Sequence, residues 1–532
     1  MSNSNNEGKI LKNSVGVSLA TLASRFLGLL RVRLEALTLG GGTIASIWFL
    51  TLMIPNLLRR LLGEGALGTA LTPIIAETER AESISQARKH LAQIFAMLGA
   101  LLALIVVIVS LAAWFWGRHG ILYGYGIMQS DRVIGTCQLL PLIMPYAFFI
   151  CLTGVIGAVL NYSGIFVRPA LTALFFNLCM ILGLCAGVFF HLPPQSLLTL
   201  LALLTPAAGA IQFLLMLWLL FSCGRFPIFD RETFKSFAVT GRLIKLATPG
   251  LIGYGVLQLS FLIDRTLALY LNDQAVPALT YVDRIIDLPI GLFAVSLGSV
   301  LMAAMTHAAA EKDWDAMRRQ LNFSLRHVWF VGAPMAAGVI FFHVEILRVL
   351  CLGGRYTQAD LDATRLVAIF YGMGIPFFCT LKVLLPAFYS RQDMKRPFYV
   401  SLAAISLNII LNLILMFPLK QGGLALATVI ASITNNTVLL FLLHRDGFPL
   451  EKSTILSCCR SGAIAFASGA AVWFIMPFIR CRFSASFGND CLLLLICAIA
   501  FAITFFVLAI LCRTPELKEF FNILRRKKKN SD

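Results

Sequence analysis

The chain has 532 residues, of which 58% are hydrophobic and only 13% charged, and its formal net charge is +18. A soluble globular domain carries about 25% charged residues, so this composition excludes that class. The apolar residues come in runs of about twenty, the length that crosses a hydrocarbon core ~30 Å thick. The sequence therefore predicts a polytopic helical membrane protein, all-α in class.

Apolar segments are predicted to form about 14 transmembrane helices. An even number of crossings places both termini on the same side of the membrane. We expect an N-terminal six-helix bundle at 14–221, a C-terminal six-helix bundle at 245–443, two extra helices at 455–512 and a basic cytoplasmic tail at 513–532. The segments lie near residues 14–39, 43–62, 91–117, 134–160, 168–190, 197–221, 245–271, 277–303, 327–349, 363–388, 397–417, 423–443, 455–479 and 490–512.

The two halves of the chain share small and polar landmarks. The sequence ALGTAL at 66–71 is matched by SLGSVL at 296–301, 230 residues later, and AVLNYS at 158–163 is matched by PAFYS at 386–390. Six segments per copy would keep the second copy in the orientation of the first. The bundles should then be related by an axis along the membrane normal, as in parallel-repeat transporters. Chance similarity between two apolar stretches is the alternative.

The cationic residues are distributed unequally across the membrane. Of the 44 Lys and Arg residues, 28 lie on the side that carries the termini, 8 on the opposite side, and 8 within or at the ends of segments. Because short cytoplasmic loops carry an excess of Lys and Arg, we expect both termini to be cytoplasmic. Most of the net charge is then a topology signal that faces anionic lipid, and it requires no nucleic-acid partner.

The eight cations inside the apolar segments need another explanation. A charge at the bilayer centre costs roughly 2.5–3.5 kcal/mol on insertion scales, so such residues usually face a water-filled cavity. An excess of arginine favours an anionic ligand such as phosphate, since the guanidinium offers forked and permanently charged donors. The set consists of Arg25, Arg31, Arg33, Arg59, Arg60, Arg265, Arg284 and Lys382.

Structural roles are the alternative for several of these cations. Arg59 and Arg60 lie near the cytoplasmic end of their segment, where positive-inside anchoring is the alternative. Arg265 and Arg284 each directly follow an aspartate, so a structural ion pair is the alternative there. Lys382 lies between apolar residues with no acid nearby, which favours a cavity or a helix-end position.

The sequence contains no recognisable catalytic constellation. It has no Walker loop, no glycine-rich dinucleotide motif after a strand, and no His/Cys spacing typical of a metal site. No soluble stretch is long enough to form an ATPase domain. The chain is therefore interpreted as a transporter rather than an enzyme, with no organic cofactor.

The intramembrane charges and their neighbours resemble those of the MurJ/MviN family of lipid II flippases, which belongs to the multidrug/oligosaccharidyl-lipid/polysaccharide exporter superfamily. The similarity spans nearly the whole chain, and its elements are intramembrane charges rather than generic apolar runs. These elements are SRFLG at 24–28 followed by Arg31, PNLLRRLLGEGAL at 55–67, YVDR at 281–284, LKVL at 381–384, FYSRQD at 388–393 and GGL at 422–424.

The resemblance implies a function and a site. The protein would flip lipid II, a polyprenyl-pyrophosphate-linked disaccharide-pentapeptide, across the bacterial cytoplasmic (inner) membrane by alternating access, for cell-wall synthesis. Central cavity arginines would bind the pyrophosphate, and the two extra helices would form a groove for the polyprenyl tail among the membrane lipids. The matching residues are Arg25, Arg31, Arg59 and Arg284, with Glu64 from the second-helix motif and Lys382 as a further substrate-binding candidate.

Some members of that family bind sodium between helices. The residues of this chain that match are Asp264, Asn408, Asn412 and Thr428, and their oxygen atoms suit a hard cation. Only Asp264 carries a formal charge. Interhelical hydrogen bonding is the alternative, because Asn408 and Asn412 lie one turn apart on the same helical face.

Two positions depart from the family pattern. The acid that usually follows the second cavity arginine is Val32 here, and the acid expected before the Pro-Asn motif is Ser46. Glu35 is a candidate to stand in for one of them. Another lipid-linked oligosaccharide flippase or a drug/cation antiporter of the same superfamily is the alternative function, and a scaffold or receptor without transport is a third. The sequence does not identify protein partners.

Overall fold

The computed structural model describes residues 2–63, 66–119, 130–230, 238–291, 295–484, 486–517 and 519. Across these ranges the regular structure is helical, which confirms the predicted all-α class. The chain forms two compact units. The first comprises Met1–Pro277 with Gly354–Tyr356, and the second comprises Ala278–Gly353 with Thr357–Asp532.

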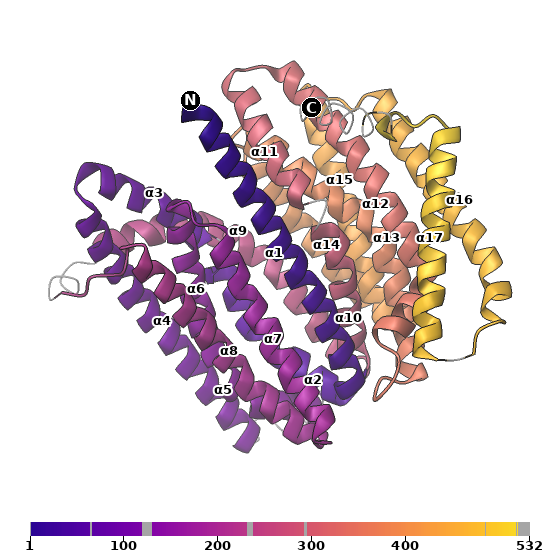
Figure 1. Ribbon diagram of the computed structural model, residues 1–532, viewed down its shortest axis with the longest axis horizontal. Coiled ribbons are helices and arrows are strands. Elements are labelled where there is room, and N and C mark those ends of the chain that lie inside the picture. Colours follow the sequence, from indigo (N-terminus) through magenta and orange to yellow (C-terminus); the bar gives the residue numbers. More distant parts are fainter. Residues whose placement is uncertain are drawn as a thin grey trace. The chain divides into compact units, whose positions relative to one another are not determined.

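Figure 1 shows the helices that form the two units. In the first unit they are α1 (Ser2–Leu39), α2 (Thr43–Leu58), the π-helix η1 (Arg59–Gly63), α3 (Ala66–Ala81), α4 (Ile84–His119), α5 (Asp131–Ile143), α6 (Pro145–Tyr162), α7 (Val167–Phe189), α8 (Pro194–Ser222) and α9 (Ala238–Leu269). The next helix, α10 (Ala275–Pro289), begins at the boundary, and the second unit continues with α11 (Val295–Ala310), α12 (Trp314–Leu350), α13 (Gln358–Tyr389), α14 (Lys395–Leu419), α15 (Gln421–Arg445), α16 (Lys452–Arg480) and α17 (Phe487–Leu511).

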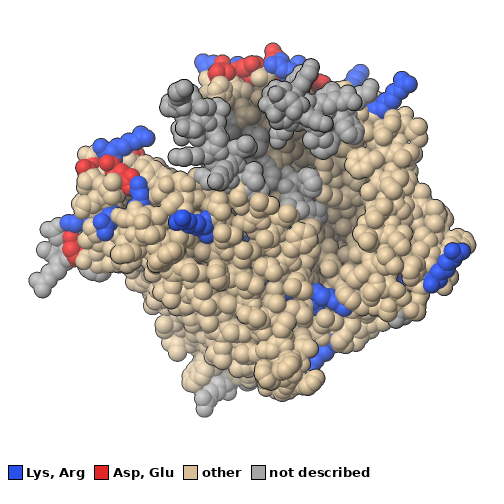
Figure 2. Space-filling model, in the orientation of Figure 1, with Lys and Arg blue, Asp and Glu red and all other residues tan. Residues whose placement is uncertain are grey.

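Among the described residues, 11 helices are long and apolar enough to cross a membrane. They correspond to eleven of the predicted segments, so the multi-pass character is confirmed, while the count of fourteen is not. The other three segments are α1 and α9, which carry arginines, and 277–303, which divides into the short helices α10 and α11. Much of the face in Figure 2 is uncharged, as a surface in contact with lipid requires.

The segment 134–160 also divides, into α5 and α6. The second of these helices has Pro145 at its first position, where the missing backbone N–H has no intrahelical partner to lose. This break was not predicted from the continuous apolar run, because hydropathy alone does not reveal where a proline starts a new helix rather than kinks an old one.

The order of the helices repeats along the chain. After α2 the backbone forms the π-helix η1 and then the short α3 and the long α4; after α10 it is again π-helical at residues 290–291, and the short α11 and the long α12 follow. A π-turn adds a residue to a helical turn and redirects the helix after it. The two sequence copies therefore bend their helices at equivalent places.

Matched glycines occupy equivalent contacts in the two copies. A Cβ on Gly68 of α3 would lie 3.4 Å from the Cβ of Ala158 on α6, while a Cβ on Gly298 of α11 would lie 2.7 Å from the carbonyl oxygen of Lys382 on α13. Small residues allow helix backbones to approach closely in membrane proteins. Both glycines thus lie at a helix contact, but a Cβ would clash with backbone only at Gly298 and would make an ordinary contact at Gly68.

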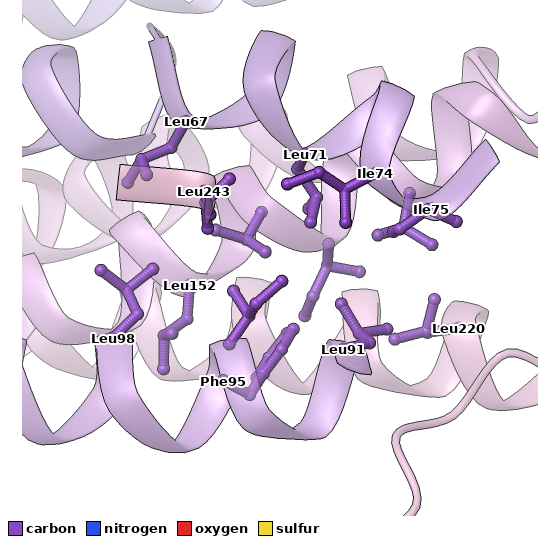
Figure 3. Packing of buried hydrophobic residues seen from close by; sticks show 14 of the residues in the cluster. Leu67, Leu71, Ile74, Ile75, Leu91, Phe95, Leu98, Leu152, Leu220 and Leu243 are labelled. Atoms are coloured by element: carbon purple, nitrogen blue, oxygen red, sulfur yellow. The ribbon is translucent and has the colours of Figure 1, made fainter. Parts of the chain in front are cut away.

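A cluster of buried aliphatic side chains joins five helices of the first unit (Figure 3). Side chains from α3, α4, α6, α8 and α9 interdigitate there, and Phe95 of α4 contributes an aromatic ring. In the view of Figure 3, α3 lies above and α4 below the cluster. The members that Figure 3 labels besides Phe95 are Leu67, Leu71, Ile74, Ile75, Leu91, Leu98, Leu152, Leu220 and Leu243.

Helix α6 approaches the π-helix η1 through two glycines. A Cβ on Gly154 of α6 would overlap the carbonyl oxygen of Gly63 and would lie only 2.7 Å from its Cα, while a Cβ on Gly63 would lie 3.4 Å from the Cα of Cys151. Backbone atoms cannot move aside as a flexible side chain can. This contact therefore requires glycine on α6 and holds the segment that begins with Arg59.

We predict that Gly154→Ala lowers the free energy of unfolding by about 1–3 kcal/mol, because overpacking against backbone forces a helix to shift. Thermal unfolding of the purified chain in detergent measures this change. The matched control is Gly241→Ala on α9, where an added Cβ has no heavy atom within 4 Å. A Gly154→Ala variant as stable as the Gly241→Ala variant would contradict the close approach.

The last two helices form a hairpin that packs on α12. Aromatic rings line this contact: the centroids of Phe330 on α12 and Phe505 on α17 lie 5.5 Å apart. Beyond α17, Glu516 is fully buried, accepts a 2.5 Å hydrogen bond from Ser457 of α16, and lies 3.9 Å from Arg326 of α12. The extra helices are thus held to α12 along their length and beyond the end of α17.

Candidate functional site

Helix α1 carries the first two predicted site arginines. Arg25 and Arg31 are six residues apart, about 600° around a helix, so they do not share one face. Both side chains are partly exposed. Next to Arg25, Ser24 accepts a 3.2 Å hydrogen bond through its carbonyl oxygen from Nδ2 of Asn177 on α7. The contact with α7 fixes the rotation of α1 about its axis.

Arg31 lies among three side chains from three helices. Its Nε is 3.6 Å from Oε1 of Glu35, one turn further along α1. The same carboxylate oxygen accepts a 3.2 Å hydrogen bond from Nε1 of Trp48 on α2. The Phe176 ring of α7 lies 5.3 Å from the guanidinium carbon of Arg31. A carboxylate and an aromatic ring both favour a cation in a low-dielectric setting.

The second pair of arginines lies in the π-helix η1. Arg59 is its first residue and is partly exposed. Arg60 is exposed, donates a 3.2 Å hydrogen bond through Nη1 to Oε1 of Gln258 on α9, and lies 5.5 Å from the ring of Phe261. A π-turn inside a helix frequently marks a functional site. Here it gives neighbouring arginines different environments.

Phe261 also contacts a second cation. Arg265, one turn further along α9, is only 2% exposed, and its guanidinium carbon lies 4.7 Å from the Phe261 ring centroid. Sequence reasoning missed this aromatic residue. Its position one turn before Arg265 was the available signal, since residues four apart on a helix are neighbours.

The two departures from the family pattern have separate local explanations. Val32 is buried, with only 1% of its surface exposed, and a valine there needs no charge partner. Ser46 is also buried and donates a 2.6 Å hydrogen bond to the backbone carbonyl of Asp273, in the turn between α9 and α10. The Asp273 carboxylate accepts a hydrogen bond from Thr43 and lies 3.2 Å from Nε of Arg132. An acid therefore does lie at the start of α2, but it comes from a distant part of the sequence.

The remaining substrate-binding candidates lie elsewhere. Arg284, on α10, is partly exposed, and Asp287 follows it one turn later. Lys382, on α13, is exposed. Both belong to the second unit, whereas Arg25, Arg31 and Arg59 belong to the first. Glu64 lies outside the described residues.

Three of the four sodium-site candidates form a hydrogen-bonded chain in the second unit. Asn412 donates a 3.1 Å bond to Oδ1 of Asn408, and Asn408 donates a 3.2 Å bond to the hydroxyl of Thr428 on α15. Asn412 is fully buried. Asp264, the charged candidate, belongs to the first unit and is buried on α9. The neutral chain fits the interhelical alternative, and sodium binding stays a prediction.

We predict that Asn408→Ala lowers the free energy of unfolding by about 0.6–1.7 kcal/mol, because it removes the hydrogen bond from α14 to Thr428 of α15 and loss of an interhelical hydrogen bond has this effect in membrane proteins. Thermal unfolding in sodium chloride and in choline chloride should give the same loss. The control is Ser406→Ala, because this exposed α14 hydroxyl bonds only within its own helix, to Leu402. A melting temperature that rises with sodium in the unmodified chain, but not in Asn408→Ala, would establish sodium binding instead.

The helices and their arginines define a polytopic helical membrane protein. Solved structures with this fold include "Lipid II flippase MurJ, inward closed conformation", with a TM-score of 0.74 and 24% identity over 93% of this chain and 98% of that one. An inward-facing multidrug resistance MATE family transporter has a TM-score of 0.65 at 13% identity, over 81% of this chain and 98% of that one.

Sequence comparison identifies the particular family. The model of the lipid II flippase MurJ family matches residues 36–487. A probable lipid II flippase MurJ from Vibrio cholerae is 31% identical over 87% of this chain and 89% of its own length, and one from Rhizobium tropici is 28% identical over 98% and 97%. The chain belongs to the lipid II flippase MurJ family. The predicted family is thus confirmed, and with it a transporter rather than an enzyme.

Proposed function

We propose that this chain flips lipid II from the cytoplasmic to the outer leaflet of the bacterial inner membrane by alternating access, as a step in peptidoglycan synthesis and hence in the maintenance of cell shape. The observation that carries the proposal is the set of arginines on helices that match predicted membrane segments, Arg25 and Arg31 on α1 and Arg59 on η1. Family membership supports this function over a drug/cation antiporter, because relatives carry the lipid II flippase name.

Arginine suits the pyrophosphate of such a substrate. A guanidinium offers parallel N–H donors that match two phosphate oxygens, and it stays charged at any physiological pH. We propose that Arg25, Arg31 and Arg59 bind the pyrophosphate together with Arg284, and that Glu64 and Lys382 contact other parts of the headgroup. An organic-cation carrier would need an acidic cavity instead.

The hairpin of α16 and α17 is the proposed contact for the polyprenyl tail. Both helices expose large apolar side chains, among them Phe474 and Phe478 on α16 and Ile503 and Ile510 on α17. Transfer of a long hydrocarbon chain into water raises the free energy, so the tail stays in the lipid beside such a surface while the headgroup crosses.

The membrane potential favours this direction of transport. With the cytoplasm negative and both termini cytoplasmic, moving one negative charge outward is favoured by about 2.3 kcal/mol per 100 mV. After release, the same field acts on the positively charged empty site and draws it back toward the cytoplasm. The potential can therefore support both halves of the cycle without a dedicated ATPase domain.

We predict that Arg31→Ala slows flipping at least about tenfold, because hydrogen bonds between charged groups contribute more than 1.4 kcal/mol, the equivalent of a factor of about ten. Proteoliposomes with lipid II, in which a membrane-impermeant reagent modifies headgroups on the outside, measure the rate. Arg365→Ala is the control, since this exposed arginine pairs only with Asp362 on its own helix. Flipping at the normal rate by Arg31→Ala would remove Arg31 from the site.

Collapse of the membrane potential is expected to slow headgroup translocation, since the electrical term above would vanish. Proteoliposomes with an imposed potassium gradient and valinomycin set the potential at chosen values, and the rate is followed as above. Protein-free liposomes report leakage. A flipping rate independent of the imposed potential would contradict the electrical contribution.

A further inference from the structure

A buried carboxylate lies beside one of the proposed substrate arginines. Glu35 is only 1% exposed, and its Oε1 is 3.6 Å from Nε of Arg31. An ion pair of this i, i+4 order, with the cation nearer the N-terminus, is the weaker arrangement on a helix. The pair therefore needs support from outside α1, and Trp48 of α2 provides it with a 3.2 Å hydrogen bond to the same oxygen.

The guanidinium of Arg31 is held on one edge and one face. Glu35 lies next to Nε, and the Phe176 ring lies 5.3 Å from the central carbon. The terminal Nη atoms form the other end of the fork, and they are the donors that grip two phosphate oxygens. The side chain of Arg31 keeps 16% of its surface exposed, whereas that of Glu35 keeps 1%. A ligand can thus reach the arginine without touching the glutamate.

We propose that Glu35 is a positioning residue that orients Arg31 and competes with the bound phosphate for it. The inference rests on the proposed function, because it needs a phosphate on Arg31. While the site is empty, Glu35 balances the arginine's charge within the apolar interior. When a pyrophosphate binds, the two anions share one cation, which weakens the complex enough for release on the opposite side.

Trp48 limits how strongly Glu35 competes with the phosphate. If the guanidinium shifts toward a phosphate, the carboxylate loses part of its ion pair, and a buried charge without compensation is strongly unfavourable. The indole N–H still satisfies Oε1, so it lowers the cost of that loss. Because Coulomb attraction grows as the dielectric constant falls, a short displacement in this interior changes the affinity for phosphate considerably.

The test compares affinity with turnover in the full chain. Glu35→Gln keeps the size of the side chain and an acceptor for Trp48 but removes the charge. It is expected to bind farnesyl pyrophosphate, a short-chain polyprenyl pyrophosphate, about tenfold more tightly, since a competing charge-assisted contact is lost. The same variant should flip lipid II with a lower KM and a lower maximal rate, because release becomes slower.

A second variant is expected to shift the affinity for farnesyl pyrophosphate in the opposite direction. Trp48→Phe keeps the charge but removes the indole donor, so the carboxylate should depend more strongly on Arg31 and the affinity for farnesyl pyrophosphate should fall. Trp48 fluorescence provides an independent signal: the emission change on binding, taken as the difference between the unmodified chain and Trp48→Phe, should be lost in Arg31→Gln.

The matched control is Glu345→Gln on α12. Glu345 is another buried glutamate, 3.5 Å from Arg480, in the second unit. The Glu345→Gln variant should be less stable, but its affinity for farnesyl pyrophosphate and its rate of flipping should not change. If Glu35→Gln also left affinity and rate unchanged, or if it bound farnesyl pyrophosphate more weakly, the positioning role of Glu35 would be overturned. An unmodified chain that does not bind farnesyl pyrophosphate, or an Arg31→Gln variant that binds it equally well, would instead refute the proposed phosphate site.

Discussion

The cost of burying a guanidinium in a low-dielectric interior constrains much of this structure. The partly buried Arg31 and the buried Arg265 each lie against an aromatic ring, and Arg31 lies beside a carboxylate as well. Ring and carboxylate lower the cost of the charge without removing it. Among the described residues, further arginine–aromatic contacts are those of Arg225 with Tyr162 and of Arg391 with Phe388 and Phe448, and the exposed Arg60 also contacts Phe261.

The same constraint has different solutions in the two copies of the repeat. The turns after α8 and α15 each contain a glycine with positive φ, Gly224 at 69° and Gly447 at 90°. After the first turn, Arg225 pairs with Glu79. Beside the second, the acid is Asp446, which Arg391 and Arg396 contact at 2.8 and 2.7 Å. Burial alone raises the pKa of Asp446, but these two guanidinium groups hold it below its usual value. The two turns thus share a glycine with positive φ, whereas the positions of the acid and of the arginines differ between the two copies.

The acids around the site illustrate how far sequence position can mislead. In the sequence, Val32 and Ser46 stand where the family usually has acids. In the structure the carboxylate of Glu35 lies beside Arg31, and the carboxylate of Asp273 lies at the start of α2. Glu35 was a candidate because it is one helical turn from Arg31. Asp273 could not be inferred, since it is far from α2 along the chain and reaches it only through the turn between α9 and α10.

The sequence by itself determined the class of the protein, the course of most apolar helices, the internal repeat and the identity of the intramembrane cations. These follow from hydropathy, spacing and charge, which are local properties of the chain. Only the tertiary structure decided which partner each cation has, as with Trp48 reaching Glu35 from another helix and Phe261 contacting both Arg60 and Arg265. The physical reason is that such contacts depend on how each helix is rotated about its axis and where it bends. Packing of small residues and π-turns sets both, and neither is visible in an apolar run.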